Sequence, residues 1–213
     1  MCSHTFIKNV VVKKPNLDHE VLGNYRPVSK LPYLSKILKK AVADQLQAHL
    51  DTNSLHVKFH LAYRRGHSPE TALLRILNLL VMTDGGNNAV LVLLDQSAAF
   101  DTLDHMLLLQ RLHAEIGLDG STLDWFSSYL SCRSQQVLVG HALSAETPLL
   151  CGVPQGLVLG PLLFSLYTRQ LADLSDKFCT DDHFFADDSK LYSCLPTEPE
   201  SALSALRNVE SCC

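Results

Sequence analysis

An apolar run that ends in a carboxylate is the feature that most limits how this chain can fold. Residues 89–95 have the sequence AVLVLLD, an unbroken apolar series followed by Asp95. A short run without helical periodicity is typical of a buried strand that has apolar neighbours on both faces. A charge at the end of such a strand should be paired, exposed at the sheet end or bound to a cation. We therefore expect a buried central strand with a functional residue at its end.

A second acidic site lies towards the C-terminus. The stretch 183–193, HFFADDSKLYS, places Asp187 and Asp188 between two apolar runs, a pattern that predicts a β-hairpin with the carboxylates at its turn. Adjacent like charges repel. Two interpretations remain open, an Asx-type turn and a metal site in which a cation relieves the repulsion. Asp95 has a similar alternative, because it could instead be the N-cap of a helix that continues through SAAFDTLDH.

The three carboxylates converge if the strand and the hairpin are neighbours in one sheet. Asp95 would then lie at a strand end, beside Asp187 and Asp188 at the hairpin turn. Two Mg²⁺ ions about 3.5–4 Å apart can be bridged by such a group, which is the arrangement used for in-line phosphoryl transfer.

The remaining pattern predicts a mixture of helices and strands. We expect an irregular stretch over about residues 1–30, which is polar and ends near two prolines. Apolar spacing and start signals predict helices at 33–50, 68–82, 103–116, 121–131, 161–174 and after Pro199, and further strands at 55–67 and 135–140. Strands and helices do not alternate strictly, so the predicted fold class is α+β.

Composition and charge exclude several classes of protein. With 213 residues, 46% of them hydrophobic and 19% charged, the chain is typical of a globular protein with a core. It has neither a run of the ~18 apolar residues that span a bilayer nor a signal-peptide layout. We therefore expect an intracellular protein of the nucleus or cytoplasm, with no membrane partner.

None of the seven cysteines forms a CxxC pair, which argues against a zinc ribbon or a disulfide framework. The net charge of −4 argues mildly against strong autonomous nucleic-acid binding, without excluding a local basic groove.

Taken together, five sequence blocks resemble the reverse transcriptases of non-LTR (LINE-type) retrotransposons. In chain order they are NYRPVSKLPYLSKILKK, YRRGHSPETALL, LVLLDQSAAFDTLDH, GVPQGLVLGPLLFSLY and FFADD. The resemblance covers about residues 24–192. It implies the fingers and palm of that family, with an antiparallel palm sheet and packed helices. The implied organisation is an N-terminal extension at 1–23, a fingers-like region at 24–88 and a palm-like region at 89–213.

The resemblance also implies a catalytic metal site and an activity. In the family, the residues that match Asp95 and Asp187 bind the catalytic metals, and the match to Asp188 completes the triad. Two Mg²⁺ ions are expected, with Mn²⁺ as an alternative. The implied function is an RNA-directed DNA polymerase that transfers a nucleotide from a dNTP to a primer 3′-OH. The implied partners are an RNA template, a DNA primer and dNTPs.

Further residues match substrate-contacting positions of the family. Phe100 matches the bulky residue under the incoming sugar, where a ring would clash with a 2′-OH, although ordinary core packing would also explain it. Gln155 resembles the residue that lines the nucleotide pocket, and Gly152 and Gly156 would let the backbone approach the substrate. Arg64 resembles the fingers arginine that contacts the triphosphate, a suitable role for a planar multidentate donor.

The chain also departs from the family pattern. Phe185 stands where the family usually has Tyr before ADD; it keeps the ring next to the carboxylates and is a further substrate-binding candidate. Leu157 replaces the usual Ser after PQG, and Leu61 and Ala62 replace a Ser-Gly pair in the fingers block. The sequence ends at Cys213 without a thumb, so we expect a partial copy of such an element.

Two rival functions follow from these departures. The first is a catalytically inactive, retrotransposon-derived remnant or binding module, which the missing thumb, Leu157 and the acidic balance favour. The second is a metal-dependent nuclease that uses the same carboxylates, which the AF and PQG blocks disfavour.

Overall fold

The structure, a computed structural model, divides into two compact units. The first unit comprises Met1–Leu55 and Phe100–Leu166, and the second comprises His56–Ala99 and Tyr167–Cys213. The residues that the structure describes are 5–13, 18, 20–21, 25–30, 32–56, 88–95, 99–139, 141–153, 159–177, 181–185, 188–195, 203–205, 207 and 209. Each unit is therefore assembled from two separate stretches of chain. The division at residues 23 and 88 that the sequence suggests stays a prediction.

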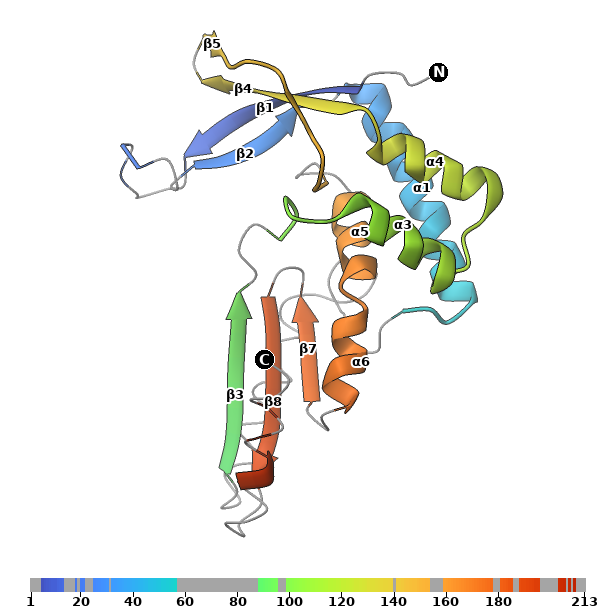
Figure 1. The fold of residues 1–213 in the computed structure, drawn as a ribbon, viewed down its shortest axis with the longest axis vertical. Coiled ribbons are helices and arrows are strands. Elements are labelled where there is room, and N and C mark those ends of the chain that lie inside the picture. The colour runs from blue at the N-terminus through green and yellow to red at the C-terminus, as the bar shows by residue number, and fades with distance from the viewer. Residues whose placement is uncertain are drawn as a thin grey trace. The chain divides into compact units, whose positions relative to one another are not determined.

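A mixed sheet forms one part of the first unit (Figure 1). Its strands are β1 (Thr5–Lys13), β2 (Tyr25–Lys30), β4 (Arg133–Val139), β5 (Ala142–Leu143) and β6 (Thr147–Pro148). The order is β2-β1-β4-β5, and β6 also pairs with β4. The β1–β4 pair is parallel, whereas β2, β5 and β6 join antiparallel.

The two N-terminal strands correct the expectation of an irregular segment over residues 1–30. β1 pairs with β2 from Lys8↔Lys30 to Lys13↔Tyr25. It also pairs with β4, which lies far away along the chain. Pairing partners that are distant in sequence leave no local pattern, so the β1–β4 pair was not expected. The run Val10–Val12 in β1 is a local strand signal that was overlooked. The predicted strand at 135–140 is confirmed as β4.

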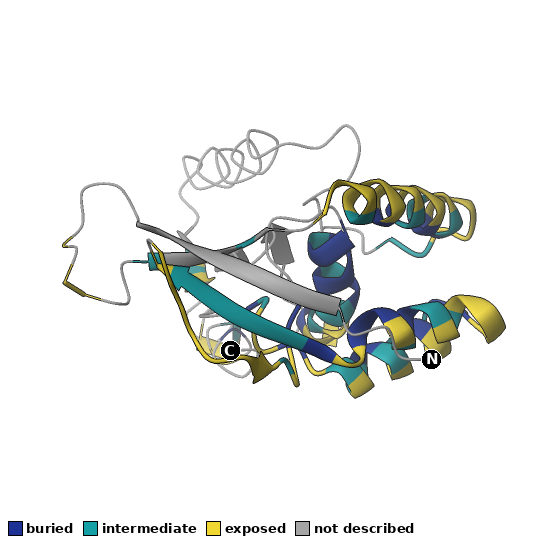
Figure 2. Ribbon diagram, turned by 90° about the horizontal axis from the view of Figure 1, so that it is seen from above, coloured by how far each residue is buried: buried dark blue, intermediate teal, exposed yellow. Residues whose placement is uncertain are grey.

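Four helices lie among the described residues of the first unit. They are α1 (Tyr33–Thr52), α3 (His105–Ala114), α4 (Gly120–Leu130) and α5 (Leu159–Tyr167, which is in this unit up to Leu166). The first three confirm predicted helices to within a few residues. Their apolar faces supply the core, shown dark blue in Figure 2. The fully buried leucines on or next to these helices are Leu50, Leu103, Leu108, Leu112, Leu130, Leu159 and Leu163.

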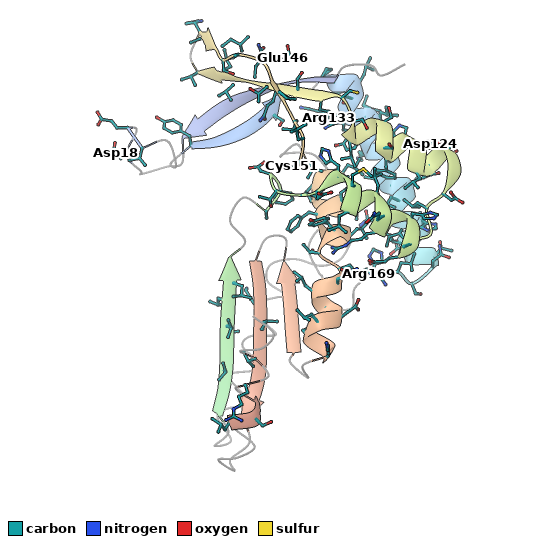
Figure 3. The ribbon with its side chains drawn as sticks, in the orientation of Figure 1. Asp18, Asp124, Arg133, Glu146, Cys151 and Arg169 are labelled. Atoms are coloured by element: carbon teal, nitrogen blue, oxygen red, sulfur yellow. The ribbon has the colours of Figure 1, made fainter. Side chains whose placement is uncertain are left out.

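Two buried cations lie in the interior of the first unit, around the ring of Tyr129. Lys39 of α1 and Arg133 at the start of β4 are each only 4% exposed; Figure 3 labels Arg133 at the start of β4. Arg133 Cζ lies 4.1 Å from the centroid of the Tyr129 ring, and Lys39 Nζ lies 5.1 Å from it. Trp125 stacks on the same ring, with centroids 5.3 Å apart and the planes at 7°. We call Lys39, Tyr129 and Arg133 the Tyr129 cluster.

The positive charges of the Tyr129 cluster lack a carboxylate among the residues that the structure describes. Lys39 Nζ and Arg133 Nε and Nη1 are buried and have no hydrogen-bond partner within that part of the chain. Burial, and secondly the charge of Arg133, lower the pKa of Lys39 to about 8. The aromatic ring offers a cation–π contact, which offsets part of the desolvation of the two charges.

The second unit contains a three-stranded antiparallel sheet (Figure 1). It is built from β3 (Asn88–Asp95), β7 (Asp181–Phe185) and β8 (Asp188–Leu195) in the order β3-β8-β7. Helix α6 (Gln170–Lys177) contacts β7. The sheet confirms the predicted strand at 89–95, the predicted hairpin around residues 186–187 and the predicted α+β class. Residues 203–205, 207 and 209 are helical, in the segment where a helix was expected.

Strand β3 differs from its prediction in position. It lies at the edge of the described sheet, paired with β8 alone, and was expected to be central. Leu91, Leu93 and Leu94 are exposed, Leu93 to 65%. An apolar run shows that both faces of a strand tolerate apolar contacts, but it does not show whether a neighbour pairs on each side. The prediction of a buried central strand was therefore wrong for the residues that the structure describes.

The single helix predicted at 161–174 is also wrong, because the chain forms two. α5 ends at Tyr167 and α6 begins at Gln170. Between them the N–H of Leu171 donates to the carbonyl of Thr168, and that of Ala172 to Arg169, which are three-residue turn bonds. No Gly or Pro marks this break.

Two predicted segments lie almost entirely outside the described residues, the strand at 55–67 and the helix at 68–82. Among the helices that are described, none is both long enough and apolar enough to cross a membrane.

Candidate active site

Two of the three candidate carboxylate residues share one rung of the sheet in the second unit. Asp95, the last residue of β3, is the register partner of Asp188, the first residue of β8. Asp188 is in turn the partner of Phe185, the last residue of β7. Directly opposed residues on antiparallel strands have Cβ atoms about 4.5–5.5 Å apart. The backbone therefore brings Asp95 and Asp188 together at one end of the sheet, as convergence of the carboxylates requires.

Among the described residues no group of three or more His, Cys, Asp or Glu residues is placed to hold a metal ion, so a cation at this rung stays a prediction. Like charges directly opposite each other destabilise a sheet, and a bound cation removes that repulsion. Carboxylate oxygens are also the ligands that Mg²⁺ prefers. Asp187, directly before Asp188, lies outside the described residues, as do Arg64, Gln155, Gly156 and Leu157. The roles expected for these residues stay predictions.

The alternative interpretation of Asp95 as a helix N-cap is wrong. Asp95 ends a strand, and the next described helix, α3, begins only at His105. Its N-cap is Asp104, whose carboxylate accepts a 2.9 Å hydrogen bond from the backbone N–H of Leu107. Capping of this helix therefore leaves Asp95 available for another role.

Phe100 lies in the first unit and packs as a core residue. Its ring centroid is 4.8 Å from that of Phe164 on α5, with the planes tilted by 42°. The residue as a whole is of intermediate burial. The packing interpretation of Phe100 is confirmed, and the contact with a substrate sugar stays a prediction.

The backbone at Gly152 approaches the turn that carries Phe100. Gly152 has φ +80°, and a Cβ there would lie 2.8 Å from the carbonyl oxygen of Asp101. The N–H of Gly152 donates to the carbonyl of Leu103 at 2.7 Å, and that of Val153 donates to Phe100 at 2.8 Å. Gly152 was expected to allow close approach to a substrate. Its lack of a side chain is required by the chain's own turn, and the approach to a substrate stays a prediction.

The side chain of His105 adds a third hydrogen bond between Gly152 and the turn that carries Phe100. His105, the first residue of α3, donates from Nε2 to the carbonyl of Gly152 at 2.8 Å. The bond is partly buried and joins residues 47 positions apart. Together with the two backbone bonds, it fastens residues 152–153 to the turn at 100–105. We call this set of three hydrogen bonds the Gly152 latch.

Comparison with known proteins identifies the family of this chain. Residues 12–213 match the family described as "Reverse transcriptase (RNA-dependent DNA polymerase)". The chain belongs to the reverse transcriptase family. It is 30% identical over 162 residues to the "Probable RNA-directed DNA polymerase from transposon X-element" of Drosophila melanogaster, which covers 76% of the chain and 18% of that protein. It is also 30% identical over 163 residues to the "RNA-directed DNA polymerase from mobile element jockey" of the same species, with the same two shares.

These relatives make the chain a LINE-type reverse transcriptase domain, and the chain spans less than a fifth of their length. Solved structures agree on the fold. Apo telomerase from Candida tropicalis superposes with a TM-score of 0.62 at 12% identity, over 97% of this chain and 46% of that one. Telomerase from Candida albicans gives 0.60 at 12% identity, over 96% and 39%. The expected fingers and palm fold is therefore confirmed.

His105 is the residue of this reverse transcriptase domain that the sequence analysis missed. It lies inside the LVLLDQSAAFDTLDH block, but a single histidine carries no signal of its own. Its partner is a backbone carbonyl, which every residue has, so no pattern of side chains could have shown the pairing.

Proposed function

We propose that this domain is an RNA-directed DNA polymerase that extends a primer 3′-OH with a dNTP on an RNA template. The observation that carries the proposal is the register of the second unit, in which Asp95 lies opposite Asp188. Asp187 directly precedes Asp188 in the sequence and would complete the triad. The primer 3′-oxygen would attack the α-phosphate of the dNTP, and pyrophosphate would leave.

The metals would be held by Asp95, Asp187 and Asp188. Two Mg²⁺ ions, or Mn²⁺ in their place, would activate the attacking hydroxyl and neutralise the charge that develops on the leaving group. The protein would contribute by holding the three carboxylates at one end of the sheet, so that little reorganisation would be needed during the reaction.

The remaining candidates would bind the substrates. Phe100 would lie under the deoxyribose, while Gln155, Gly156 and Phe185 would line the nucleotide pocket and Arg64 would contact the triphosphate. Template and primer would be held through their phosphates and sugars, because base pairing with the template already determines the sequence. We expect this chemistry inside the cell, in the nucleus or cytoplasm.

A primer-extension assay with an RNA template, dNTPs and Mg²⁺ tests the proposal. We expect the wild-type chain to extend the primer, and Asp95→Asn and Asp187→Asn to lower the rate by a factor on the order of 10² or more. Asp124→Asn is the matched control, because it removes an exposed carboxylate from α4 in the first unit and should leave the rate unchanged. Equal rates in all four proteins would contradict the assignment.

A non-catalytic remnant is the second candidate, and one structural observation favours it. The Tyr129 cluster buries two cations without a carboxylate among the described residues, an arrangement that reduces stability. A wild-type chain that melts cooperatively but does not extend the primer would decide for the remnant. Thermal melting measured with and without Mg²⁺ adds a second readout, because a metal that binds the folded chain raises the melting temperature. Asp95→Asn should abolish that rise.

A further inference from the structure

The Gly152 latch joins two sequence blocks of the first unit through a single stretch of backbone. Gly152 donates to Leu103 and accepts from His105, while Val153 donates to Phe100. All three bonds therefore end in the turn at residues 100–105. The space that the missing Cβ leaves at Gly152 is filled by backbone atoms of Phe100 and Asp101 at 2.8–2.9 Å. Because of this close packing, residues 152–153 can hardly move without the turn at residues 100–105 moving as well.

Phe100 lies between two fixed points of this arrangement. Its carbonyl accepts the hydrogen bond from Val153, and its ring packs against Phe164 on α5. The hydrogen bond from Val153 fixes the backbone of Phe100, and the contact with Phe164 fixes the position of its ring. A shift of residues 152–153 would therefore move the Phe100 ring.

His105 is suited to hold the latch. It begins α3, whose first turn is fixed by the Asp104 cap on Leu107. A side chain on a capped helix presents its donor with less freedom than one on a loop. The bond to the Gly152 carbonyl is partly buried, so water competes with it less than at the surface.

We propose that His105 is a positioning residue that holds the backbone of Gly152 against the turn of Phe100 and so sets the placement of the Phe100 ring. Its effect on substrate choice rests on the proposed function. With the ring correctly placed, a nucleotide that carries a 2′-OH is excluded; with the latch open, the ring moves and ribonucleotides are accepted more readily.

Three variants test this role. His105→Leu removes the donor, and His105→Gln keeps an N–H close to the position of Nε2. His113→Leu is the matched control, because His113 lies on the same helix and bonds through Nδ1 to the carbonyl of Leu118 at 3.0 Å, far from Gly152 in sequence. A general loss of helix stability would affect His105→Leu and His113→Leu alike, whereas the latch is lost only in the first.

The first readout is amide hydrogen exchange at Gly152 and Val153, whose N–H groups donate within the latch. We expect exchange there to become at least about tenfold faster in His105→Leu, to return close to the wild-type rate in His105→Gln, and to stay unchanged in His113→Leu. Wild-type exchange rates at both amides in His105→Leu would overturn the proposal.

The second readout is the ratio of dNTP to rNTP incorporation in primer extension. We expect the ratio to fall several-fold in His105→Leu and to recover in His105→Gln. An unchanged ratio together with faster exchange would make His105 merely structural and would overturn the positioning role. A wild-type chain without extension would overturn the proposed function and, with it, the effect on substrate choice. The exchange rates would still decide whether His105 holds the latch.

Discussion

Around Gly152, the N–H groups of Gly152 and Val153 and the ring of His105 all have partners, whereas around Tyr129 the Nζ of Lys39 and the Nε and Nη1 of Arg133 have no hydrogen-bond partner among the described residues. Both regions belong to the first unit and both bring distant parts of the sequence together. They differ in what replaces the hydrogen bonds to water that buried polar groups lose on folding. The Gly152 latch replaces each lost water with a hydrogen bond, and the Tyr129 cluster offers an aromatic ring instead.

This difference has opposite consequences for substitution. Removing part of a satisfied network leaves its partners unpaired and destabilises the protein. Removing a buried charge that has no partner relieves a desolvation penalty and can stabilise it. We therefore expect substitutions in the Gly152 latch to lower the free energy of unfolding and an apolar substitution at Lys39 to raise it.

The largest effect is expected for Gly152→Ala. A side chain at φ +80° is strained, and its Cβ would lie 2.8 Å from the Asp101 carbonyl oxygen. Together these should lower the free energy of unfolding by about 3 kcal/mol, measured by urea denaturation. Gly117→Ala is the control, because Gly117 has φ +73° but open space around its missing Cβ, so about 1 kcal/mol is expected. Equal losses of unfolding free energy in the two variants would contradict the claim that backbone crowding at Gly152 adds to the cost of a side chain.

Lys39→Met should have the next largest effect, in the opposite direction. The change keeps an apolar stem of similar length and removes a charge that is 4% exposed. We expect the free energy of unfolding to rise by about 2 kcal/mol in urea denaturation at pH 7. Lys40→Met, an exposed neighbour on α1, should change it little. A loss of stability in Lys39→Met would mean that the Lys39 charge is compensated in a way that the cluster does not show.

The pH dependence of that gain is the third expectation. The pKa of Lys39 is about 8 in the folded chain and is lowered from an ordinary 10.5, chiefly by burial. Below about pH 8 Lys39 is protonated in both the folded and the unfolded chain, so the full free-energy cost of burying its charge is present. Between about 8 and 10.5 the unfolded state binds more protons, so the wild type gains stability as the pH rises. Most of the difference between Lys39→Met and wild type should therefore disappear by pH 10, and a constant difference from pH 7 to 10 would contradict the assignment.

The smallest effect is expected for Asp104→Ala, which removes the N-cap of the helix that carries His105. The loss of the bond to Leu107 should lower the free energy of unfolding by about 1 kcal/mol. Asp104→Asn should retain most of the wild-type stability, because Asn caps nearly as well as Asp. The measurement is thermal melting of both variants, and an Asn variant as unstable as the Ala variant would rule out capping as the cause.

Elements with a strong local signal were predictable from the sequence. Apolar spacing located α1, α3 and α4, and turn chemistry located the β7–β8 hairpin. These helices and the hairpin depend on residues that are close in sequence, which is why pattern alone was sufficient. The pairing of Asp95 with Asp188 joins distant residues, and the sequence predicted it only on the condition that the strand and the hairpin are neighbours in one sheet.

Features that depend on distant partners were not predictable. β1 gains its partner β4 from far along the chain, and the bond of His105 to Gly152 spans 47 residues. The break between α5 and α6 at Thr168 and Arg169 carries no Gly or Pro to mark it. In each case the decisive interaction is made by backbone groups, which are the same in every residue, so the partner left no trace in the sequence. For β1 the strand itself did leave one, the run Val10–Val12.

Strand β3 has a practical consequence for handling the isolated chain. Its leucines are exposed, and within the described residues no strand pairs with its outer edge. Exposed apolar side chains on a strand favour contact with a second molecule, so samples should self-associate as they are concentrated. Leu93 is 65% exposed, so Leu93→Lys should reduce this self-association without disturbing buried contacts. Without such a substitution, solubility rather than folding would limit the concentration at which this domain can be studied.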